Sequence, residues 1–458
     1  MDNTAPLRSE KVSRLLWKFS LPAVVAMVFN SLYNIIDRIF VGRGVGAIAI
    51  AATTVAFPMM LILMAVSVLI GVGATSLISI RLGEKKPQEA EKIIGNAMLL
   101  LILFPVCLSV IYFLFCDPIL MFFGASAEVL PYARDFTHIV MMASVIGSIS
   151  MGMVNFIRAE GNPKVAMYSQ VMGTVVNIIL NYLFVMRLGF GIKGSAWATV
   201  CGQTFSTILV LGYFLFGPSL LKIKLQNFKL QSKLVFSIMA IGFAPFAMQL
   251  ANSLQNTILN KTLMTYGGDL ALSAMGIIGS LSTLMFMPIL GISQGAQPII
   301  GFNYGATQYS RVREALKLAV IAGTVTACAC TIVMQVWPVQ IVSLFSNNNV
   351  ELTRLTSHAM RIFFLMFPIA GFQIICSQYF QAVGKPIQAT ILGLSRQLLL
   401  LVPLLLILPH FWGIEGVWRT PPIADILAAS ITAFFITLEM KRMKEREALP
   451  PSVAREQQ

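Results

Sequence analysis

The sequence has few charged residues for its length. Asp, Glu, Lys and Arg together make up 11% of its 458 residues, whereas 57% of the residues are apolar. A soluble domain has roughly 25% charged residues, so the surface of this chain could not be hydrated as that of a soluble protein is. The composition therefore excludes a soluble enzyme of several domains and indicates an all-α membrane protein.

Patterns for metal binding and catalysis are also missing. The chain has three His and six Cys, and neither residue type shows the spacing of a zinc site or a disulfide framework. No Asp-x-x-x-Asp pair and no Gly-x-Ser-x-Gly arrangement occurs within an apolar segment, which argues against the alternative of an intramembrane enzyme. We expect no catalytic residue, no metal centre and no cofactor.

The apolar residues gather in segments that are long enough to cross a bilayer, which takes about 20 residues. The first segment follows several basic residues, as in a signal peptide, but no cleavage site of small residues follows it, so it is interpreted as a retained span. The sequence predicts twelve spans, at residues 17–40, 51–80, 93–115, 137–158, 165–187, 192–216, 234–263, 270–302, 314–336, 358–382, 387–408 and 414–440.

The basic residues indicate how these spans are oriented. Most of the 33 Lys and Arg residues precede the first span, follow the last one, or fall in the loops on that same side. Because cytoplasmic loops carry the excess of Lys and Arg, we expect both termini to be cytoplasmic. The net charge of +14 then reflects topology, and no nucleic-acid partner is expected.

The two halves of the chain share motifs at a nearly constant displacement. Asn30-Ser-Leu-Tyr-Asn34 returns as Asn252-Ser-Leu-Gln-Asn256, 222 residues later. Four further features recur in the same order at 222 or 223 residues: Pro22 and Pro245, Gly83 and Gly305, Gly161-Asn-Pro163 and Gly384-Lys-Pro386, and Gly191-Ile-Lys-Gly194 and Gly413-Ile-Glu-Gly416. Five ordered matches are difficult to obtain by chance, so the chain is predicted to be an internal duplication.

Each half holds six spans, an even number, so both halves have the same orientation in the membrane. We predict two parallel-repeat six-helix bundles with a central cleft, an architecture that suits alternating access in secondary transporters. Residues 1–216 form the first bundle and residues 234–440 the second, with a cytoplasmic linker at 217–233 and a cytoplasmic tail at 441–458.

Asp37 is an acid within an apolar segment. It lies about 20 residues after Trp17, or roughly 30 Å along a helix, which together with tilt places it in the outer half of the membrane. An ionised, unpaired carboxylate is costly there and marks a site for a coupling cation. The alternative is an outer-loop acid that lies in water beside Arg38 and Arg43.

Four polar residues are predicted to lie near the depth of Asp37. Asn34 precedes it by one turn, Asn177 and Asn181 share one face of span five, and Thr199 lies on span six. With Asp37 they form a candidate cation-coupling layer. The alternative is that these groups form hydrogen bonds between helices as packing.

A second candidate lies in the other half. Helix rise places Arg396 and Asp425 near the bilayer midplane on adjacent spans, which predicts an ion pair. The pair is either structural or a gated proton element.

With these motifs, the chain resembles the multidrug and toxic compound extrusion (MATE) family, and more closely its MepA-like branch. The resemblance covers all but the tails. The residues that carry it are Pro22, Asn30-Ser-Leu-Tyr-Asn-Ile-Ile-Asp37-Arg, Phe156-Ile-Arg-Ala-Glu-Gly-Asn-Pro163-Lys, Asn177-Ile-Ile-Leu-Asn181, Gln381-Ala-Val-Gly-Lys-Pro386, Arg396-Gln and Pro422-Ile-Ala-Asp425.

The resemblance implies a cation-coupled antiporter that exports bulky, often cationic, amphipathic drugs or toxins from bacteria across the cytoplasmic (inner) membrane, and we expect it to be monomeric. The acid of span one in the family maps onto Asp37, its polar pair of span five onto Asn177 and Asn181, and its threonine of span six onto Thr199. Its asparagine of span four maps near Asn155, which helix rise places closer to the cytoplasm. A lipid-linked precursor flippase of the same superfamily is the alternative function.

One departure from the family bears on the coupling ion. Relatives usually carry an acid at the position of Asn181, so Asp37 is the one clear carboxylate of the layer. A single carboxylate can exchange a proton, whereas sodium needs several oxygen ligands. We therefore expect proton coupling, with Na⁺ as the alternative. Neutralisation of Asp37 is expected to repack the first helix around Pro22, the predicted bending point.

Overall fold

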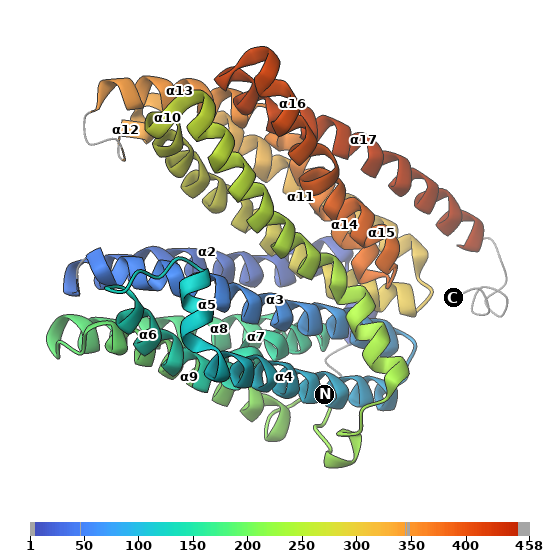
Figure 1. The fold of residues 1–458 in the computed structure, drawn as a ribbon. Coiled ribbons are helices and arrows are strands. Elements are labelled where there is room, and N and C mark those ends of the chain that lie inside the picture. Colours follow the sequence, from blue (N-terminus) through green and yellow to red (C-terminus); the bar gives the residue numbers. More distant parts are fainter. Residues whose placement is uncertain (1–4, 46, 344, 346–348, 448–458) are drawn as a thin grey trace. The chain divides into compact units, whose positions relative to one another are not determined.

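A computed structural model of the chain describes residues 5–45, 47–343, 345 and 349–447, without the side chains of residues 34, 35, 38, 39, 42–44, 47, 50 and 225. Every regular element in these ranges is helical (Figure 1). The prediction of an all-α protein is therefore confirmed for the part of the chain that is described.

The helices divide into two compact units. The first unit comprises Met1–Ser9 and Val25–Gly242, and the second comprises Glu10–Val24 and Phe243–Gln458. Two long helices contribute to both units, α2 (Val12–Gly44) and α10 (Ser232–Gly305). The division falls within a few residues of Pro22 in α2 and of Pro245 in α10, the two prolines that the internal duplication pairs.

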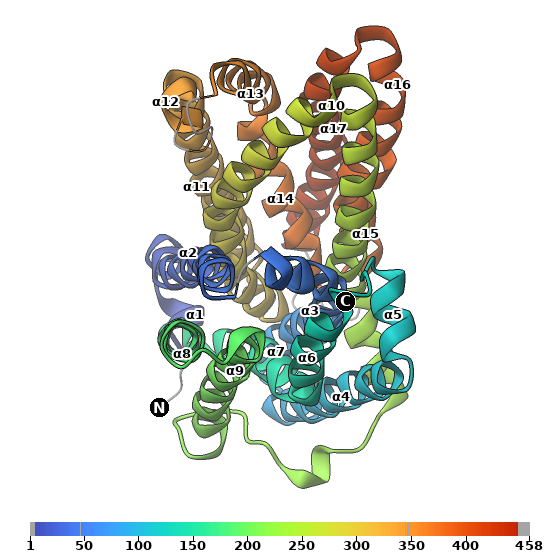
Figure 2. The same cartoon turned by 60° about the vertical axis from the view of Figure 1, so that its left-hand side comes forward.

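The first unit contains the C-terminal part of α2 and the helices up to α9. In it α8 packs against α9, and α3 packs against α4 and α7 (Figure 2). Its elements are α1 (Ala5–Ser9), α3 (Ala47–Gly83), α4 (Pro87–Leu114), α5 (Cys116–Phe122), α6 (Leu130–Met142), α7 (Ser144–Ala159), α8 (Pro163–Asn181), the π-helix η1 (Tyr182–Arg187), α9 (Gly191–Leu215) and the 3₁₀ turn η2 (Leu225–Asn227).

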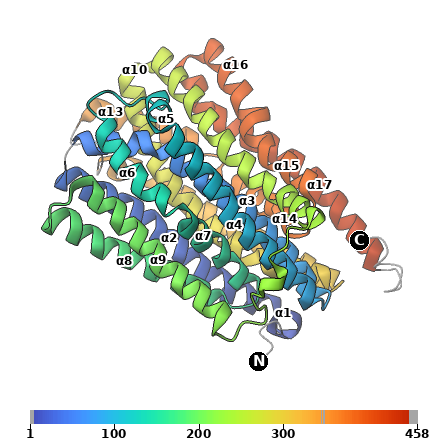
Figure 3. The same cartoon turned by 60° about the horizontal axis from the view of Figure 1, so that its bottom comes forward.

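The second unit repeats this sequence of elements. Here α14 packs against α11, α15 and α17, and α16 runs beside α17 (Figure 3). Its elements after α10 are α11 (Tyr309–Val336), α12 (Pro338–Ser343), α13 (Val350–Phe363), α14 (Phe367–Ala382), α15 (Pro386–Leu394), the π-helix η3 (Ser395–Leu401), α16 (Val402–Trp412) and α17 (Ile414–Glu447).

Helix α10 is two helices joined at a break. Its 74 residues would extend for about 110 Å as a single straight helix, far more than the roughly 30 Å of a bilayer core. Gly268 interrupts it with φ 62° and ψ −161°, a conformation that glycine adopts at low cost. The break separates the predicted spans 234–263 and 270–302.

Two predicted spans are broken rather than continuous. The fourth consists of α6 and α7, which meet at 56°, and the tenth consists of α13 and α14, which meet at 50°. Among the described residues nine helices are long and apolar enough to span a bilayer, or eleven if each bent pair is one span. Since α10 holds two helices, this result is consistent with twelve spans.

The turns that begin α8 and α15 explain one of the repeated motifs. Gly161 and Gly384 have φ values of 95° and 73°, which favour glycine. Two residues later, Pro163 and Pro386 start their helices, at a position where the missing backbone N–H costs nothing.

Small residues set the spacing of α8 and α9. A Cβ atom added to Gly173 would lie 2.9 Å from the carbonyl oxygen of Gly202, and one added to Gly202 would lie 2.7 Å from that of Gly173. The two helices therefore approach closely at this level, and this contact positions the polar side chains that both helices carry farther along.

Candidate functional site

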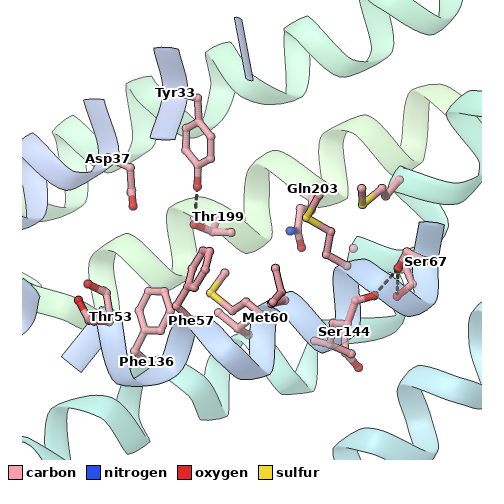
Figure 4. A pocket seen from close by; sticks show the side chains of 18 of the residues that line it. Tyr33, Asp37, Thr53, Phe57, Met60, Ser67, Phe136, Ser144, Thr199 and Gln203 are labelled. Atoms are coloured by element: carbon pink, nitrogen blue, oxygen red, sulfur yellow. Dashed lines mark hydrogen bonds between the residues drawn. The ribbon is translucent and has the colours of Figure 1, made fainter. Parts of the chain in front are cut away.

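A cavity of about 450 Å³ lies within the first unit (Figure 4). Its polar lining consists of Tyr33 and Asp37 from α2, Thr53, Thr54 and Ser67 from α3, Ser144 and Ser148 from α7, and Thr199 and Gln203 from α9. Its apolar lining includes Phe57, Met60, Leu61, Met64, Phe136, Val140 and Met151. Asp37 is the one carboxylate among these lining residues.

Asp37 accepts hydrogen bonds from two helices. The amide Nδ2 of Asn181 at the end of α8 donates to Oδ1 of Asp37. The hydroxyl of Ser195 on α9 donates to the same oxygen at 3.1 Å. Donors of this kind stabilise a carboxylate that is removed from water.

A second set of contacts lies beside the carboxylate. The amide Nδ2 of Asn177 donates to Thr199 Oγ1 at 3.3 Å, and the Tyr33 hydroxyl lies 3.4 Å from the same oxygen (Figure 4). The structure therefore brings Asp37, Asn177, Asn181 and Thr199 together, as the depth estimate predicted. Asn177 and Asn181 do not line the cavity but each contacts a residue that does.

Two buried oxygens at this site are unsatisfied. The side-chain oxygens of Asn177 and Asn181 have no hydrogen-bond partner among the described residues, and the two residues are 5% and 1% exposed. A buried acceptor without a donor is costly. Both oxygens could be satisfied by a proton donor or by a cation, which is the type of ligand that the sequence predicts here.

Two further residues were predicted for cation coupling, Asn34 and Asn155. Asn34 lies in α2, but its side chain is outside the described residues. The Oδ1 atom of Asn155 accepts a hydrogen bond from Arg158 at 3.0 Å, and its Nδ2 donates to the Met151 carbonyl. Asn155 is thus engaged about two turns of α7 beyond Ser148 of the cavity wall and lies apart from the cluster around Asp37.

The layer predicted from the sequence omits Ser195, Tyr33 and Gln203. Ser195 precedes Thr199 by four residues on α9, and Tyr33 precedes Asp37 by four residues on α2. Residues four apart share a helix face, so the same spacing that linked Asn177 to Asn181 could have identified them. The described residues contain no group of three or more His, Cys, Asp or Glu side chains that could hold a metal ion.

In the second unit, Arg396 and Asp425 are in contact. Arg396 Nε lies 2.5 Å from Asp425 Oδ1, and the side chains are 17% and 3% exposed. Arg396 belongs to the π-helix η3, and its guanidinium carbon lies 5.6 Å from the ring centroid of Phe286. The pair thus connects η3 with α17 inside the second unit.

Glu160 is a buried acid in the turn between α7 and α8. It accepts hydrogen bonds from Tyr213, from Ser219 and from the backbone N–H of Leu221, at 2.9, 2.7 and 2.8 Å. Burial raises its pKa to about 7, although these donors act in the opposite direction. Ser219 Oγ also lies 2.8 Å from the Leu221 carbonyl oxygen. One hydroxyl proton cannot serve both contacts, so a proton on Glu160 would complete the network.

Comparison with known proteins adds independent information. A family model described as MatE matches residues 22–183 and again residues 245–407. The multidrug export protein MepA of Staphylococcus haemolyticus (strain JCSC1435) is 24% identical over 425 residues, which are 93% of this chain and 93% of that protein.

Solved structures share the fold. The structure of the MATE multidrug transporter DinF-BH, solved as a complex, is 35% identical, with a TM-score of 0.87 over 94% of this chain and 96% of that one. The outward-facing conformation of a multidrug resistance MATE family transporter of the MOP superfamily has a TM-score of 0.92 at 23% identity, over 97% and 99% of the two chains.

Proposed function

The chain belongs to the MatE family, and on this basis we propose that it is a multidrug efflux antiporter driven by a cation gradient. One relative is named a multidrug export protein, MepA, and another a MATE multidrug transporter, DinF-BH. The observation that carries the proposal is the cavity of the first unit, where Asp37 is the one carboxylate among the described lining residues and the rest of that wall is apolar or uncharged.

The cavity suits a bulky amphipathic cation. Methionine and phenylalanine side chains re-pack around ligands of different shape, and they supply much of the apolar wall, as Met60, Met64, Met151, Phe57 and Phe136. Asp37 supplies the negative charge that attracts a cationic drug. No Lys or Arg is among the described residues that line the cavity, which disfavours the alternative of a flippase for lipid-linked diphosphates.

Coupling follows from competition for Asp37. A drug cation is bound while Asp37 is ionised, and a proton that enters from outside neutralises the carboxylate and weakens that attraction. Protonated Asp37 becomes a donor, and a half-turn of the Asn181 amide would present its unsatisfied oxygen to that donor. The Asn181 amide can therefore form a hydrogen bond with both the ionised and the protonated form of Asp37.

Sodium is the alternative coupling ion. Asp37, Asn177 and Asn181 could supply three oxygens, and the Ser195 and Thr199 hydroxyls could supply two more. Sodium would then satisfy the two buried amide oxygens directly. We favour the proton because Asp37 is the one carboxylate in this cluster of five side chains.

Exchange also requires two conformations of different affinity, since a ligand shifts an equilibrium only through its differential binding. We propose that α2 changes its bend at Pro22 when Asp37 is neutralised. We further propose that the protein is a monomer, that it lies in the bacterial cytoplasmic membrane, and that both of its termini are in the cytoplasm.

The test is ethidium efflux from proteoliposomes, with a proton gradient and a sodium gradient imposed separately. We expect the proton gradient to drive efflux and Asp37→Asn to abolish it. Asp135→Asn is the matched control, because Asp135 is an acid of the first unit that pairs with Lys193 and is about 43% exposed. Efflux by Asp37→Asn at the wild-type rate would overturn the proposal.

A further inference from the structure

Helix α7 continues the cavity wall as a polar face. Ser144, Ser148 and Met151 line the cavity, and Asn155 and Arg158 follow Met151 by four and seven residues. Residues at these spacings lie on one face of a helix. Arg158 therefore lies on the face that borders the cavity, about 10 Å farther along α7 than Met151.

Helix α8 presents a matching face. Gln170, Asn177 and Asn181 are separated by seven and four residues and so lie in one row. At one end of the row Asn181 donates to Asp37, and at the other end Gln170 Oε1 accepts a hydrogen bond from Arg158 at 3.2 Å. This column of polar side chains thus runs from the partner of Asp37 to the partner of Arg158 within the first unit.

Arg158 is held firmly at the end of this column. Its side chain is 4% exposed, and its guanidinium donates to Asn155 Oδ1 and Gln170 Oε1. Helices α3 and α7 approach closely about 9 Å before Arg158 along α7, since a Cβ atom on Gly71 of α3 would lie 3.0 Å from the Cα atom of Gly152. A charge buried in a membrane protein is costly, and ionisable residues within spans mark ion pathways.

We propose that Arg158 is a fixed positive barrier that prevents the coupling cation from passing beyond the Asp37 site through the first unit. The inference rests on the proposed cation-coupled antiport. An antiporter must let a cation reach Asp37 without letting it cross unaccompanied, because such a leak dissipates the gradient. A fixed arginine charge repels protons and cations from a polar pathway in this way, and its guanidinium stays charged at all relevant pH values.

The size of the effect follows from Coulomb's law. The row on α8 separates Asn177 from Gln170, the partner of Arg158, by about 10 Å. A unit charge at that distance, at an effective dielectric constant of about 20, changes the occupancy of a cation by roughly ten-fold. Removal of the charge should therefore raise the leak by about this factor.

The experiment measures cation entry into proteoliposomes without drug. The full chain is reconstituted, an inside-negative voltage is imposed with potassium and valinomycin, and internal pH or sodium dyes report entry. We expect Arg158→Gln to admit the coupling cation about ten-fold faster than wild type. Arg158→Lys keeps the charge, and Arg187→Gln removes an exposed arginine at the end of η1, so both should match wild type.

A second variant covers the case in which Arg158→Gln does not fold. Gln170→Glu keeps the guanidinium but places a carboxylate beside it, so it cancels the charge without removing the side chain. This variant should leak as well. If either variant retains ethidium-driven cation exchange and shows no leak above wild type, the barrier is disproved while the antiport stands. If wild type shows no ethidium-dependent flux of either cation, the antiport itself is disproved.

Discussion

Asn181 donates its side-chain amide to Asp37 across 144 residues of sequence. The contact joins the end of α8 to α2, and it leaves the amide oxygen of Asn181 buried without a partner among the described residues. The resemblance to the family implies an acid at the position of Asn181, so this one position would separate a site with one carboxylate from a site with two.

The substitution Asn181→Asp should therefore change the coupling ion. Two neighbouring carboxylates repel each other unless a cation lies between them. A second carboxylate also adds charged oxygen ligands, which a metal cation such as sodium needs and a proton does not. We expect sodium-driven ethidium efflux to appear in the variant, at a level at least several-fold above wild type. Asn181→Ala, which adds no carboxylate, should show no such gain. Equal sodium dependence in wild type and Asn181→Asp would contradict this account of the site.

Glu160 predicts how stability depends on pH. Its pKa is raised from 4.5 to about 7 by burial, so between these values the folded protein keeps a proton that the unfolded chain has released. The group contributes stability that is fully present below about pH 4.5, is lost as the pH rises, and is gone above about pH 7. As the pH is raised from about 5 to about 8, the melting temperature of wild type should therefore decrease relative to that of Glu160→Gln.

Glu91→Gln is the control for this measurement. Glu91 contacts the same connecting segment as Glu160 does, but it pairs with Lys224 at 2.6 Å and the lysine is 42% exposed. The difference between Glu91→Gln and wild type should vary little over the same pH range. A wild-type midpoint that parallels that of Glu160→Gln at every pH would show that folding does not raise the pKa of Glu160, and it would contradict this prediction.

The close contact of α8 and α9 predicts a packing effect. In Gly173→Leu the new side chain would meet a backbone carbonyl oxygen at 2.9 Å, which cannot move without shifting α9. Overpacking of this kind costs about 1–3 kcal/mol, and the shift would also displace Asn177 and Thr199. Ethidium efflux and the thermal midpoint should both fall. Gly212→Leu is the control, because nothing in the described part of the chain lies within 4 Å of a Cβ at that position.

The effects on stability of substituting Arg396 and Asp425 are predicted to be non-additive. Removing one partner leaves a buried charge unpaired, which typically costs about 3–5 kcal/mol, whereas replacing both partners costs much less. Arg396→Met and Asp425→Leu should each lower the thermal midpoint more than the double variant does. If efflux returns with stability in the double variant, the pair is structural. A stable double variant without efflux would assign the pair a role in transport.

The sequence predicted the helical class and the order of the spans because long apolar segments mark the helices that cross a membrane. Helix rise along each span then gave the depth of its polar residues. The contact of Asp37 with the group of Asn177, Asn181 and Thr199 was predicted because the four residues were estimated to lie at a similar depth. Depth says little about how a helix is rotated, so Ser195 and Tyr33 were missed although they lie one turn from predicted residues. The bends between α6 and α7 and between α13 and α14 were missed as well, since apolar residues continue through both breaks.

The measurement that tests the central claim most directly is proton release on drug binding. Purified protein in a weakly buffered solution is mixed with ethidium in the absence of any gradient, and the released protons are counted. Competition for one carboxylate predicts that wild type releases protons as ethidium binds and that Asp37→Asn binds ethidium, if at all, without releasing any. Equal release by wild type and Asp37→Asn, or ethidium binding by wild type with neither proton release nor sodium displacement, would contradict a cation site shared with the drug at Asp37.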